Sequence, residues 1–258
     1  MKSLIANPWT ALRSLTPARI ALGRAGSGMP TGELLAFGLA HARARDAVHR
    51  ALDAERLVRE LSSLNLASQV VRSAAPDRTT YLRRPDLGRK LSEKETLQKA
   101  ENAIALIIAD GLSAPAVERH AVPLLRALIA LAPLRWAATP VAVALQGRVA
   151  LGDEIGARFG AQLAVVLIGE RPGLSSPDSL GTYLTYAPRV GRTDAERNCV
   201  SNIRPEGLGY EAAARRIDWL AAAALARGLT GVALKDESGG QTSQRITTNS
   251  SDCHRLET

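Results

Sequence analysis

Glu170 and Arg171 stand directly after the apolar run VVLIG, which spans residues 165–169. A carboxylate at the carboxyl end of a buried strand can accept hydrogen bonds from a ligand, and a neighbouring guanidinium can donate them. Open α/β sheets bind their ligands outside the carboxyl ends of their strands. The stretch VVLIGERPGLSSPDSLG (165–181) therefore indicates a ligand-binding edge rather than a simple surface turn.

Two other segments with reactive or charged side chains are expected at the same edge. Asp110 to Ser113 (DGLS) follows the apolar run AIALIIAD, and residues 187–207 form a long stretch without periodicity. Long irregular stretches inside a compact domain are usually functional. The residues of 187–207 that could contact a ligand are Arg189, Arg192, Arg197, Cys199, Asn202 and Arg204.

A structural role remains open for each of these residues. Glu170 can pair with Arg171 or Arg189, and Cys199 can act as a small buried hydrophobe. The ligand hypothesis rests on three loops that meet at one sheet edge.

Continuous apolar runs alternate with helical patterns from residue 103 onward, which is typical of an α/β fold with a parallel sheet covered on both faces. The expected strands are AIALIIAD (103–110), PVAVAL (140–145), QLAVVLIG (162–169), TYLTYA (182–187) and TGVALK (230–235). The expected helices include GDEIGARFG (152–160) and YEAAARRIDWLAAAALARG (210–228).

Residues 1–100 have a mostly helical pattern. The segment 31–53 places Leu34, Leu35 and Leu39 at helical spacing after Thr31, which can cap the first turn. A second helix, AERLVRELSSL, follows, and the Arg-rich segment 79–93 is expected to be a loop. Residues 101–235 form the α/β domain, and the polar tail 236–258 is expected to be disordered.

The sequence indicates no catalytic or metal-binding residue. The glycines of 23–33 have neither the Walker nor the G-x-G-x-x-G spacing, so that stretch is interpreted as a structural turn before a helix. The four histidines form no ligand pair at helical or finger spacing. No G-x-S-x-G nucleophile elbow occurs.

Composition favours a cytosolic protein. The chain has 258 residues, of which 46% are apolar, and two cysteines, which imply no disulfide framework. The start, MKSLIANPW, lacks the apolar run of a signal peptide, and the most apolar region is interrupted by arginines and prolines, so no membrane span is expected. The net charge of +8 is carried mainly by arginine, and the matching alanine abundance points to codon bias.

Several segments together resemble the small (light) subunit of ethanolamine ammonia-lyase. They are TPARIALGRAGSGMPT (16–31), YLRRPDLGRKL (81–91), ADGLSA (109–114), GRVALGDEIG (147–156), IGERPGLSSPDSLGTYLTYAPR (168–189) and ERNCVSNIRPEGLGYEAA (196–213). They run in the family's order over most of the chain, roughly residues 8–235. The tail after Lys235 matches nothing in the family.

The resemblance implies a Rossmann-like domain preceded by helices, which binds adenosylcobalamin at the interface with a large TIM-barrel subunit. Three positions match the family's cofactor contacts: Val149, Glu170 and Cys199. Glu170 would accept hydrogen bonds from the amides on the rim of the corrin ring, while Val149 and Cys199 would supply apolar or soft contacts. Arg171 and the arginines of 187–204 would orient Glu170 or pair with the large subunit.

The implied reaction converts ethanolamine to acetaldehyde and ammonia, with the substrate site in the large subunit and no catalytic residue in this chain. Some members of the family occupy a bacterial microcompartment. This chain starts close to the shared block, without the longer leader that would be a targeting element in such members, which argues against encapsulation. The expected location is the cytoplasm, and a bacterial microcompartment stays open as the alternative.

Two other hypotheses remain. A stand-alone nucleotide-binding Rossmann-like enzyme would need a phosphate-binding glycine motif, which is absent after residue 110. A nucleic-acid-binding module would use the arginine excess, but the arginines are scattered and aromatic stacking residues are few. The preferred hypothesis excludes nucleic acid and membrane as partners.

Overall fold

Strand β2 (Ile104–Ala109) shows how the sheet divides two cores. The side chains of Ile104, Leu106 and Ile108 pack into one hydrophobic cluster, and those of Ala105 and Ile107 pack into another. All of these side chains are almost fully buried. A strand with both faces buried reads as a continuous apolar run, as the sequence predicted.

The computed structural model describes residues 7–100 and 102–239 of the chain. Its sheet has six strands in the order β1-β3-β2-β4-β5-β6. The other five strands are β1 (Ser68–Arg72), β3 (Val141–Leu145), β4 (Leu163–Gly169), β5 (Leu180–Tyr186) and β6 (Asn198–Ile203). The α/β prediction is confirmed, but the sheet is mixed: β1, β3, β2 and β4 are parallel, while β5 and β6 run antiparallel to their neighbours.

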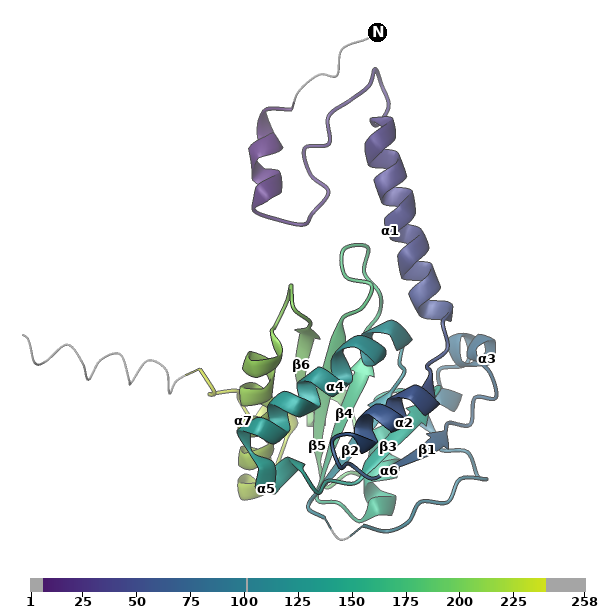
Figure 1. Ribbon diagram of the computed structural model, residues 1–258, viewed down its shortest axis with the longest axis vertical. Helices are drawn as coiled ribbons and strands as arrows, with labels where there is room; N and C mark the ends of the chain where they lie inside the picture. Colours follow the sequence, from purple (N-terminus) through teal and green to yellow (C-terminus); the bar gives the residue numbers. More distant parts are fainter. Residues whose placement is uncertain (1–6, 101, 240–258) are drawn as a thin grey trace, which may run out of the picture.

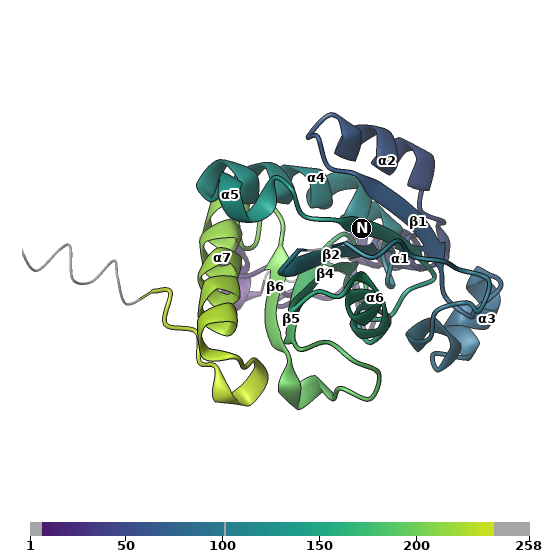
Figure 2. The same ribbon diagram turned by 90° about the horizontal axis from the view of Figure 1, so that it is seen from below.

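Helices cover both faces of the sheet (Figure 2). The described helices are α1 (Thr31–His49), α2 (Ala54–Ser62), α3 (Arg78–Arg83), α4 (Ala114–Leu131), α5 (Pro133–Trp136), α6 (Leu151–Phe159) and α7 (Tyr210–Arg227), with short 3₁₀ turns η1 (Pro8–Ser14), η2 (Leu87–Arg89), η3 (Asp194–Glu196) and η4 (Gly231–Ala233). Helices α2, α4, α5 and α7 contribute to the larger core, and α6 packs on the opposite face.

The arrangement of α4 and α6 opens a crevice at the carboxyl ends of the parallel strands. Helix α4 follows β2 onto one face of the sheet, and α6 follows β3 onto the other. Because β2 and β3 are neighbours, the two connections diverge between them. Open α/β sheets bind ligands at such switch points.

Local signals account for most helix boundaries. Asp53 caps α2 by accepting a hydrogen bond from the backbone N–H of Arg56 at 2.9 Å, and the hydroxyl of Ser113 caps α4 in the same way. Gly228 ends α7 in the left-handed conformation. Thr31, however, is the first residue of α1 and not its cap; Pro30 holds that position without a side-chain hydrogen bond.

Four sequence predictions were wrong or incomplete. The mostly helical interpretation of 1–100 missed β1, and the expected loop 79–93 contains α3 and η2. The stretch 187–207, expected to be irregular, contains β6, which pairs with β5 and forms one edge of the sheet. The segment TGVALK forms the turn η4 rather than a strand, because Gly231 adopts a left-handed φ of 80° and packs against the backbone of η3.

The glycine-rich stretch before α1 is a structural turn, as predicted. Ala25 and Gly28 exchange two backbone hydrogen bonds of 3.0 and 3.2 Å, and Gly26 between them has a φ of 65°. The turn belongs to an N-terminal arm (residues 7–30) that runs beside α1 and projects with it from the body of the protein (Figure 1). The tail from residue 240 onward, for which disorder was expected, lies outside the described residues.

Candidate functional site

A cavity of about 430 Å³ opens at the carboxyl ends of β2, β3 and β4. Its walls come from five separate segments of the sequence, and they include two of the predicted cofactor contacts, Val149 and Glu170. The other lining residues are Tyr81, Gly111, Leu112, Arg148, Ile168, Gly169, Arg171 and Tyr183. The structure therefore brings Val149 and Glu170, which the family resemblance named, to one cavity. Two of the three loops expected to converge, those after Asp110 and after Gly169, line this cavity, and the segment 187–207 does not.

A buried carboxylate positions the loop that carries Val149. Asp110, at the end of β2, accepts hydrogen bonds from the backbone N–H groups of Gln146 and Gly147, each at 3.0 Å, and from the Arg78 guanidinium at 3.2 Å. Burial raises the pKa of the Asp110 carboxyl, and the Arg78 guanidinium and the two amides oppose that rise. These contacts hold Gln146 in a left-handed conformation with a φ of 58°.

Tyr81 supports the same loop from α3. Its buried hydroxyl donates to the carbonyl of Gly147 at 3.0 Å, and its ring lies between the guanidiniums of Arg78 and Arg148, at 4.8 and 4.3 Å from the ring centroid. The Nε atom of Arg148 is buried and has no hydrogen-bond partner among the described residues. Arg148 also lines the cavity, although this Nε atom itself is buried.

Glu170 is half-buried and held by neutral donors. The hydroxyl of Ser179 and the backbone N–H of Asn202, at 3.3 Å, both donate to its carboxylate, and its own N–H donates to the Ser179 carbonyl at 2.9 Å. Within residues 7–100 and 102–239, no arginine forms an ion pair with Glu170. Direct pairing of Glu170 with Arg171 or with the arginines of 187–204 is therefore not found, and the alternative, that these arginines pair with the large subunit, stays a prediction.

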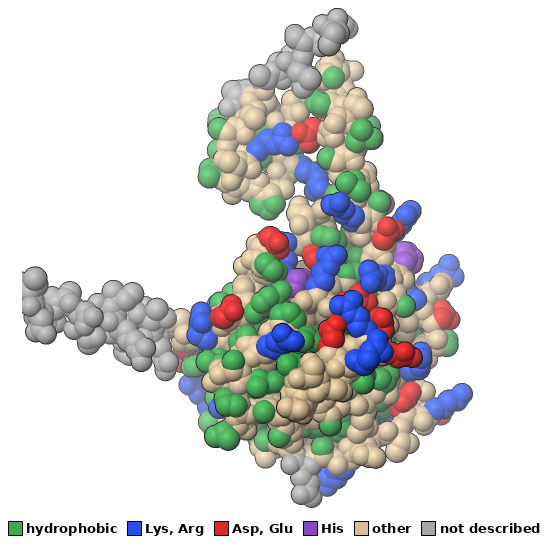
Figure 3. Space-filling model, in the orientation of Figure 1, with side chains coloured by type: hydrophobic (Ala, Val, Ile, Leu, Met, Phe, Trp, Pro, Cys, Tyr) green, Lys and Arg blue, Asp and Glu red, His purple; other side chains and the backbone are tan. Residues whose placement is uncertain are grey.

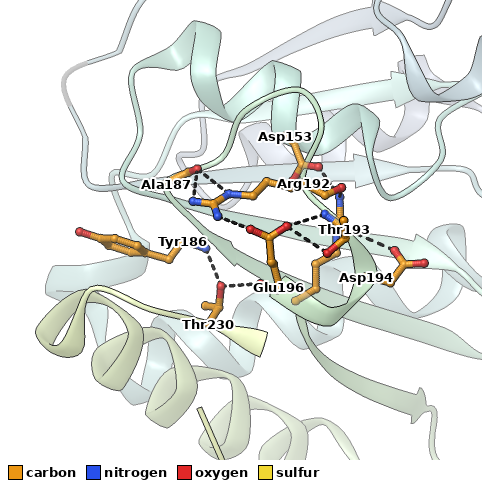
Figure 4. Close-up of polar contacts among 9 residues, drawn as sticks. Asp153, Tyr186, Ala187, Arg192, Thr193, Asp194, Glu196 and Thr230 are labelled. Atoms are coloured by element: carbon orange, nitrogen blue, oxygen red, sulfur yellow. Dashed lines mark hydrogen bonds and ion pairs between the residues drawn. The ribbon is translucent and has the colours of Figure 1, made fainter. Parts of the chain in front are cut away.

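The arginines of that stretch stabilise the loop itself (Figure 4). Arg192 pairs with Glu196 and donates to the carbonyl of Ala187, and the buried Arg197 pairs with Asp153 of α6. Arg204 donates to the side-chain oxygen of Asn202 at 3.0 Å. The segment contacts the site through Asn202 and Cys199 rather than through its positive charges.

Cys199 lies beside the cavity on β6. It is a free, exposed cysteine whose Cα pairs across the sheet with that of Tyr183, a residue that lines the cavity. Partial burial raises the pKa of the Cys199 thiol; the nearby Glu170 carboxylate adds to that rise, and the hydrogen bond with the Tyr183 hydroxyl opposes it. The alternative role of Cys199 as a buried hydrophobe is therefore excluded.

The comparison with known sequences decides the family. The sequence model for "Ethanolamine ammonia-lyase light chain (EutC)" matches residues 6–235. Small subunits of ethanolamine ammonia-lyase from Azotobacter vinelandii and Pseudomonas putida are 54% and 55% identical over 241 residues, about 90% of this chain and 89% of each relative. The Bradyrhizobium diazoefficiens small subunit is 55% identical over 249 residues, which cover 94% of this chain and 95% of the relative.

The chain belongs to the ethanolamine ammonia-lyase light chain family.

Ethanolamine ammonia-lyase is a carbon–nitrogen lyase that depends on adenosylcobalamin, and its small subunit works in a heteromer with a large subunit. The groups present in this light chain fit part of such a cofactor. A cavity of about 430 Å³ suits a small organic ligand, and a cobalamin is much larger, so this chain can cover only one side of it. The Glu170 carboxylate, which lines the cavity, offers an acceptor to peripheral amides.

Sequence reasoning missed three side chains of the light-chain site: Tyr81, Arg148 and Tyr183. Tyr81 was assigned to a loop, and only the tertiary fold brings α3 against the Gly147 loop. The position of Tyr183 could have been inferred from the sequence. Side chains alternate along a strand, so in TYLTYA the side chain of Tyr183 lies on the opposite face of the sheet from that of the buried Leu184.

No cluster of three or more potential metal ligands occurs in the described part of the light chain. None of its described helices is both long and apolar enough to span a membrane.

Proposed function

We propose that the carboxyl face of this light chain, defined by Val149, Glu170, Tyr183 and Cys199, binds the corrin ring of adenosylcobalamin at the boundary with the large subunit. The observation that supports the proposal is the convergence of Val149 and Glu170 on one open cavity, with Cys199 next to Tyr183 of its wall. These residues come from the ends of β3 and β4 and from β5 and β6.

The residues of the carboxyl face bind and orient; they do not perform the bond cleavage. When bound, adenosylcobalamin supplies an adenosyl radical by homolysis of its cobalt–carbon bond. Glu170, fixed by Ser179 and Asn202, is a preorganised acceptor for amide hydrogens. Val149 and the Cys199 thiol cover apolar surface and exclude water from it.

Conversion of ethanolamine to acetaldehyde and ammonia then takes place on the large-subunit side. The described residues of this chain support that division, because the cavity contains one carboxylate and two arginines but no histidine, serine or lysine. The chain contributes part of a cofactor site and no complete set of catalytic groups.

Equilibrium dialysis with adenosylcobalamin tests the proposal. The light chain alone, the large subunit alone and an equimolar mixture are dialysed in the dark, and the bound corrinoid is measured by absorbance. The mixture is expected to retain stoichiometric corrinoid and the light chain alone to retain little. A mixture that holds no corrinoid would refute the proposal, as would turnover of ethanolamine by the light chain alone.

Thermal shift distinguishes the two other hypotheses. A ligand raises the melting temperature of the state that it binds. NAD and ATP are expected to leave the melting temperature of the light chain unchanged, whereas a stand-alone nucleotide enzyme would be stabilised. Duplex DNA at low salt is expected to have no effect, and a steeply salt-dependent stabilisation would favour the nucleic-acid hypothesis.

A cytoplasmic location is part of the proposal. Its support is the free, exposed thiol of Cys199, which is typical of a reducing compartment. Fractionation of cells that express the tagged chain, with a periplasmic marker as the control, tests it.

A further inference from the structure

The N-terminal arm and α1 carry an unusual share of the exposed apolar side chains. Nine of the fifteen large hydrophobic residues that are exposed in the described chain lie between residues 9 and 39. They are Trp9, Leu12, Leu15, Ile20, Met29, Leu34, Leu35, Phe37 and Leu39. Figure 3 shows hydrophobic side chains in several places on the projecting part of the molecule.

Helix α1 gains little from the body of the protein. Of its 19 residues only Ala47, near the carboxyl end, is buried, and Leu35 and Leu39 are 67% and 53% exposed. Isolated helices of this length are marginally stable in water, and helices in proteins are stabilised mainly by packing of an apolar face. The exposed leucines of α1 have no such packing within the described chain.

The arm is nevertheless held in a defined position against α1. Arg13 forms a 2.9 Å ion pair with Glu33, and the Arg19 guanidinium lies over the ring of Phe37 at 5.9 Å from its centroid. The surface is therefore preorganised, which lowers the entropic cost of binding a partner.

The same arm reaches the loop of the proposed cofactor site. Arg19 donates to the carbonyl of Leu174 at 3.4 Å, and Leu174 lies in the loop between Glu170 and Ser179. Figure 1 shows the arm and α1 projecting on the side of the sheet from which this loop extends. A partner that meets the carboxyl face is thus in reach of the arm.

The charge of this region disfavours a second copy of the chain as the occupant. Residues 7–50 contain six arginines but only two carboxylates, Glu33 and Asp46. Two copies would bring together two regions of the same sign, which costs free energy at an interface. A partner with apolar side chains flanked by carboxylates matches both the exposed leucines and the arginines.

We propose that the arm–α1 surface, defined by Trp9, Leu12, Leu15, Leu34, Leu35 and Leu39, is a docking surface for the large subunit, separate from the cofactor contacts. The inference rests on the proposed function, in which the carboxyl face meets the large subunit. Exposed apolar side chains that are concentrated in one region of a soluble protein point to an interaction site. The arm and α1 anchor the light chain, and the carboxyl face then covers the cofactor.

The double variant Leu35→Asp/Leu39→Asp tests the docking surface. Both side chains are exposed, so the isolated light chain is expected to keep its far-UV circular dichroism and its melting temperature. Affinity for the large subunit, measured by titration calorimetry without cobalamin, is expected to fall about tenfold or more, because truncating or charging interface anchors costs at least that much. The matched control is Leu134→Asp on α5, whose side chain is also fully exposed but lies at the opposite end of the molecule.

The outcomes separate this inference from the proposed function. Unchanged affinity of the double variant would overturn the docking surface, as would an equal loss in Leu134→Asp. If the double variant dissociates a homo-oligomer of the light chain but keeps its affinity for the large subunit, the docking surface would also be overturned. That result would identify a second copy of the light chain as the partner of this surface. If instead the wild-type subunits associate but hold no cobalamin, the proposed function fails and the docking surface stands.

Discussion

Asp153 on α6 and Arg197, the residue before β6, form an ion pair whose side chains are only 1% and 2% exposed. Arg197 also donates to the carbonyl of Arg192 at 3.1 Å. Val149 lies two residues before α6, and Cys199 is the second residue of β6. The ion pair therefore ties together the two elements that begin beside Val149 and Cys199.

Asp153→Ala is expected to lower the free energy of unfolding by about 3–5 kcal/mol, because it removes the buried carboxylate and leaves the buried Arg197 with only the fully exposed Asp194 at 3.3 Å. Burial already raises the pKa of the Asp153 carboxyl, and the Arg197 guanidinium opposes that rise, so the pair offsets a large desolvation cost. Urea denaturation followed by circular dichroism measures the change.

The matched control is Asp46→Ala, which removes the exposed partner of Arg45. Exposed pairs contribute about 1 kcal/mol or less, so the control is expected to be near wild type. The double variant Asp153→Leu/Arg197→Met is expected to be more stable than Asp153→Ala, since no unpaired charge remains. Equal free energies of unfolding for Asp153→Ala and Asp46→Ala would show that the buried ion pair contributes no more to stability than an exposed one.

The central strands could be predicted from the sequence because burial on both faces leaves a continuous apolar run. Strands β2, β3 and β4 were each placed to within one residue at either end. Strand β1 was missed because SQVVR is short, and it becomes a strand only through its parallel pairing with β3. The antiparallel direction of β5 was also not predicted, because it depends on how the connection 170–179 returns to the sheet rather than on the residue types of the strand.

The candidate site was partly predictable for a similar reason. Glu170 follows a recognisable strand, so its place at the sheet edge was visible. The hydrogen bonds of Glu170 with Ser179 and Asn202 could not be predicted from the sequence. Asn202 lies in a strand that was not predicted, and it donates through its backbone. The buried Asp153–Arg197 pair joins residues 44 positions apart, and a single sequence does not reveal such a pairing.

Glu170→Ala is expected to weaken the binding of adenosylcobalamin to the reconstituted complex about tenfold or more. Hydrogen bonds to a charged acceptor contribute about 1.5–3 kcal/mol, which corresponds to that range. Association of the two subunits is expected to be unchanged. Corrinoid titration of the complex measures the first quantity, and sedimentation velocity measures the second.

Glu206→Ala provides the control for Glu170→Ala. The Glu206 carboxylate is 73% exposed, and its ion pair with Arg204 is long, at 3.7 Å. It is expected to bind the cofactor like wild type. Glu170→Gln retains acceptor oxygen for Ser179 and is expected to be intermediate. Wild-type cofactor affinity in Glu170→Ala would remove this residue from the site.

Cys199 is expected to react slowly with iodoacetamide at pH 8. Partial burial and the Glu170 carboxylate raise the pKa of its thiol above the ordinary value of 9.0, so less thiolate is present than for an unperturbed cysteine. In Cys253→Ser protein, the alkylation rate plotted against pH is expected to reach half its maximum above pH 9. Glu170→Gln is expected to shift that midpoint downward, because it removes the nearby negative charge.

Protection of Cys199 by the assembled enzyme follows from its place on the carboxyl face. The large subunit together with adenosylcobalamin is expected to slow the alkylation at least about tenfold, since a covered thiol cannot meet the reagent. Mass spectrometry of the modified peptide measures the rate. Alkylation at the same rate in the free and the assembled light chain would place Cys199 outside the interface.

Gly169→Ala is expected to destabilise the light chain by about 1–3 kcal/mol, the usual cost of overpacking a filled region. A Cβ atom at Gly169 would lie 2.1 Å from the carbonyl oxygen of Ser113 and 2.7 Å from that of Asp110, and neither backbone can move without opening β4 from β2. A shift of the backbone at Gly169 would also move the next residue, Glu170. Retention of cobalamin by the complex is therefore expected to fall together with the stability of the light chain in urea. Gly38→Ala is the control: its Cβ atom would meet nothing within 4 Å, and alanine favours the helix α1. Stability and cofactor retention in Gly169→Ala that match those of Gly38→Ala would contradict the close approach of the two strand ends.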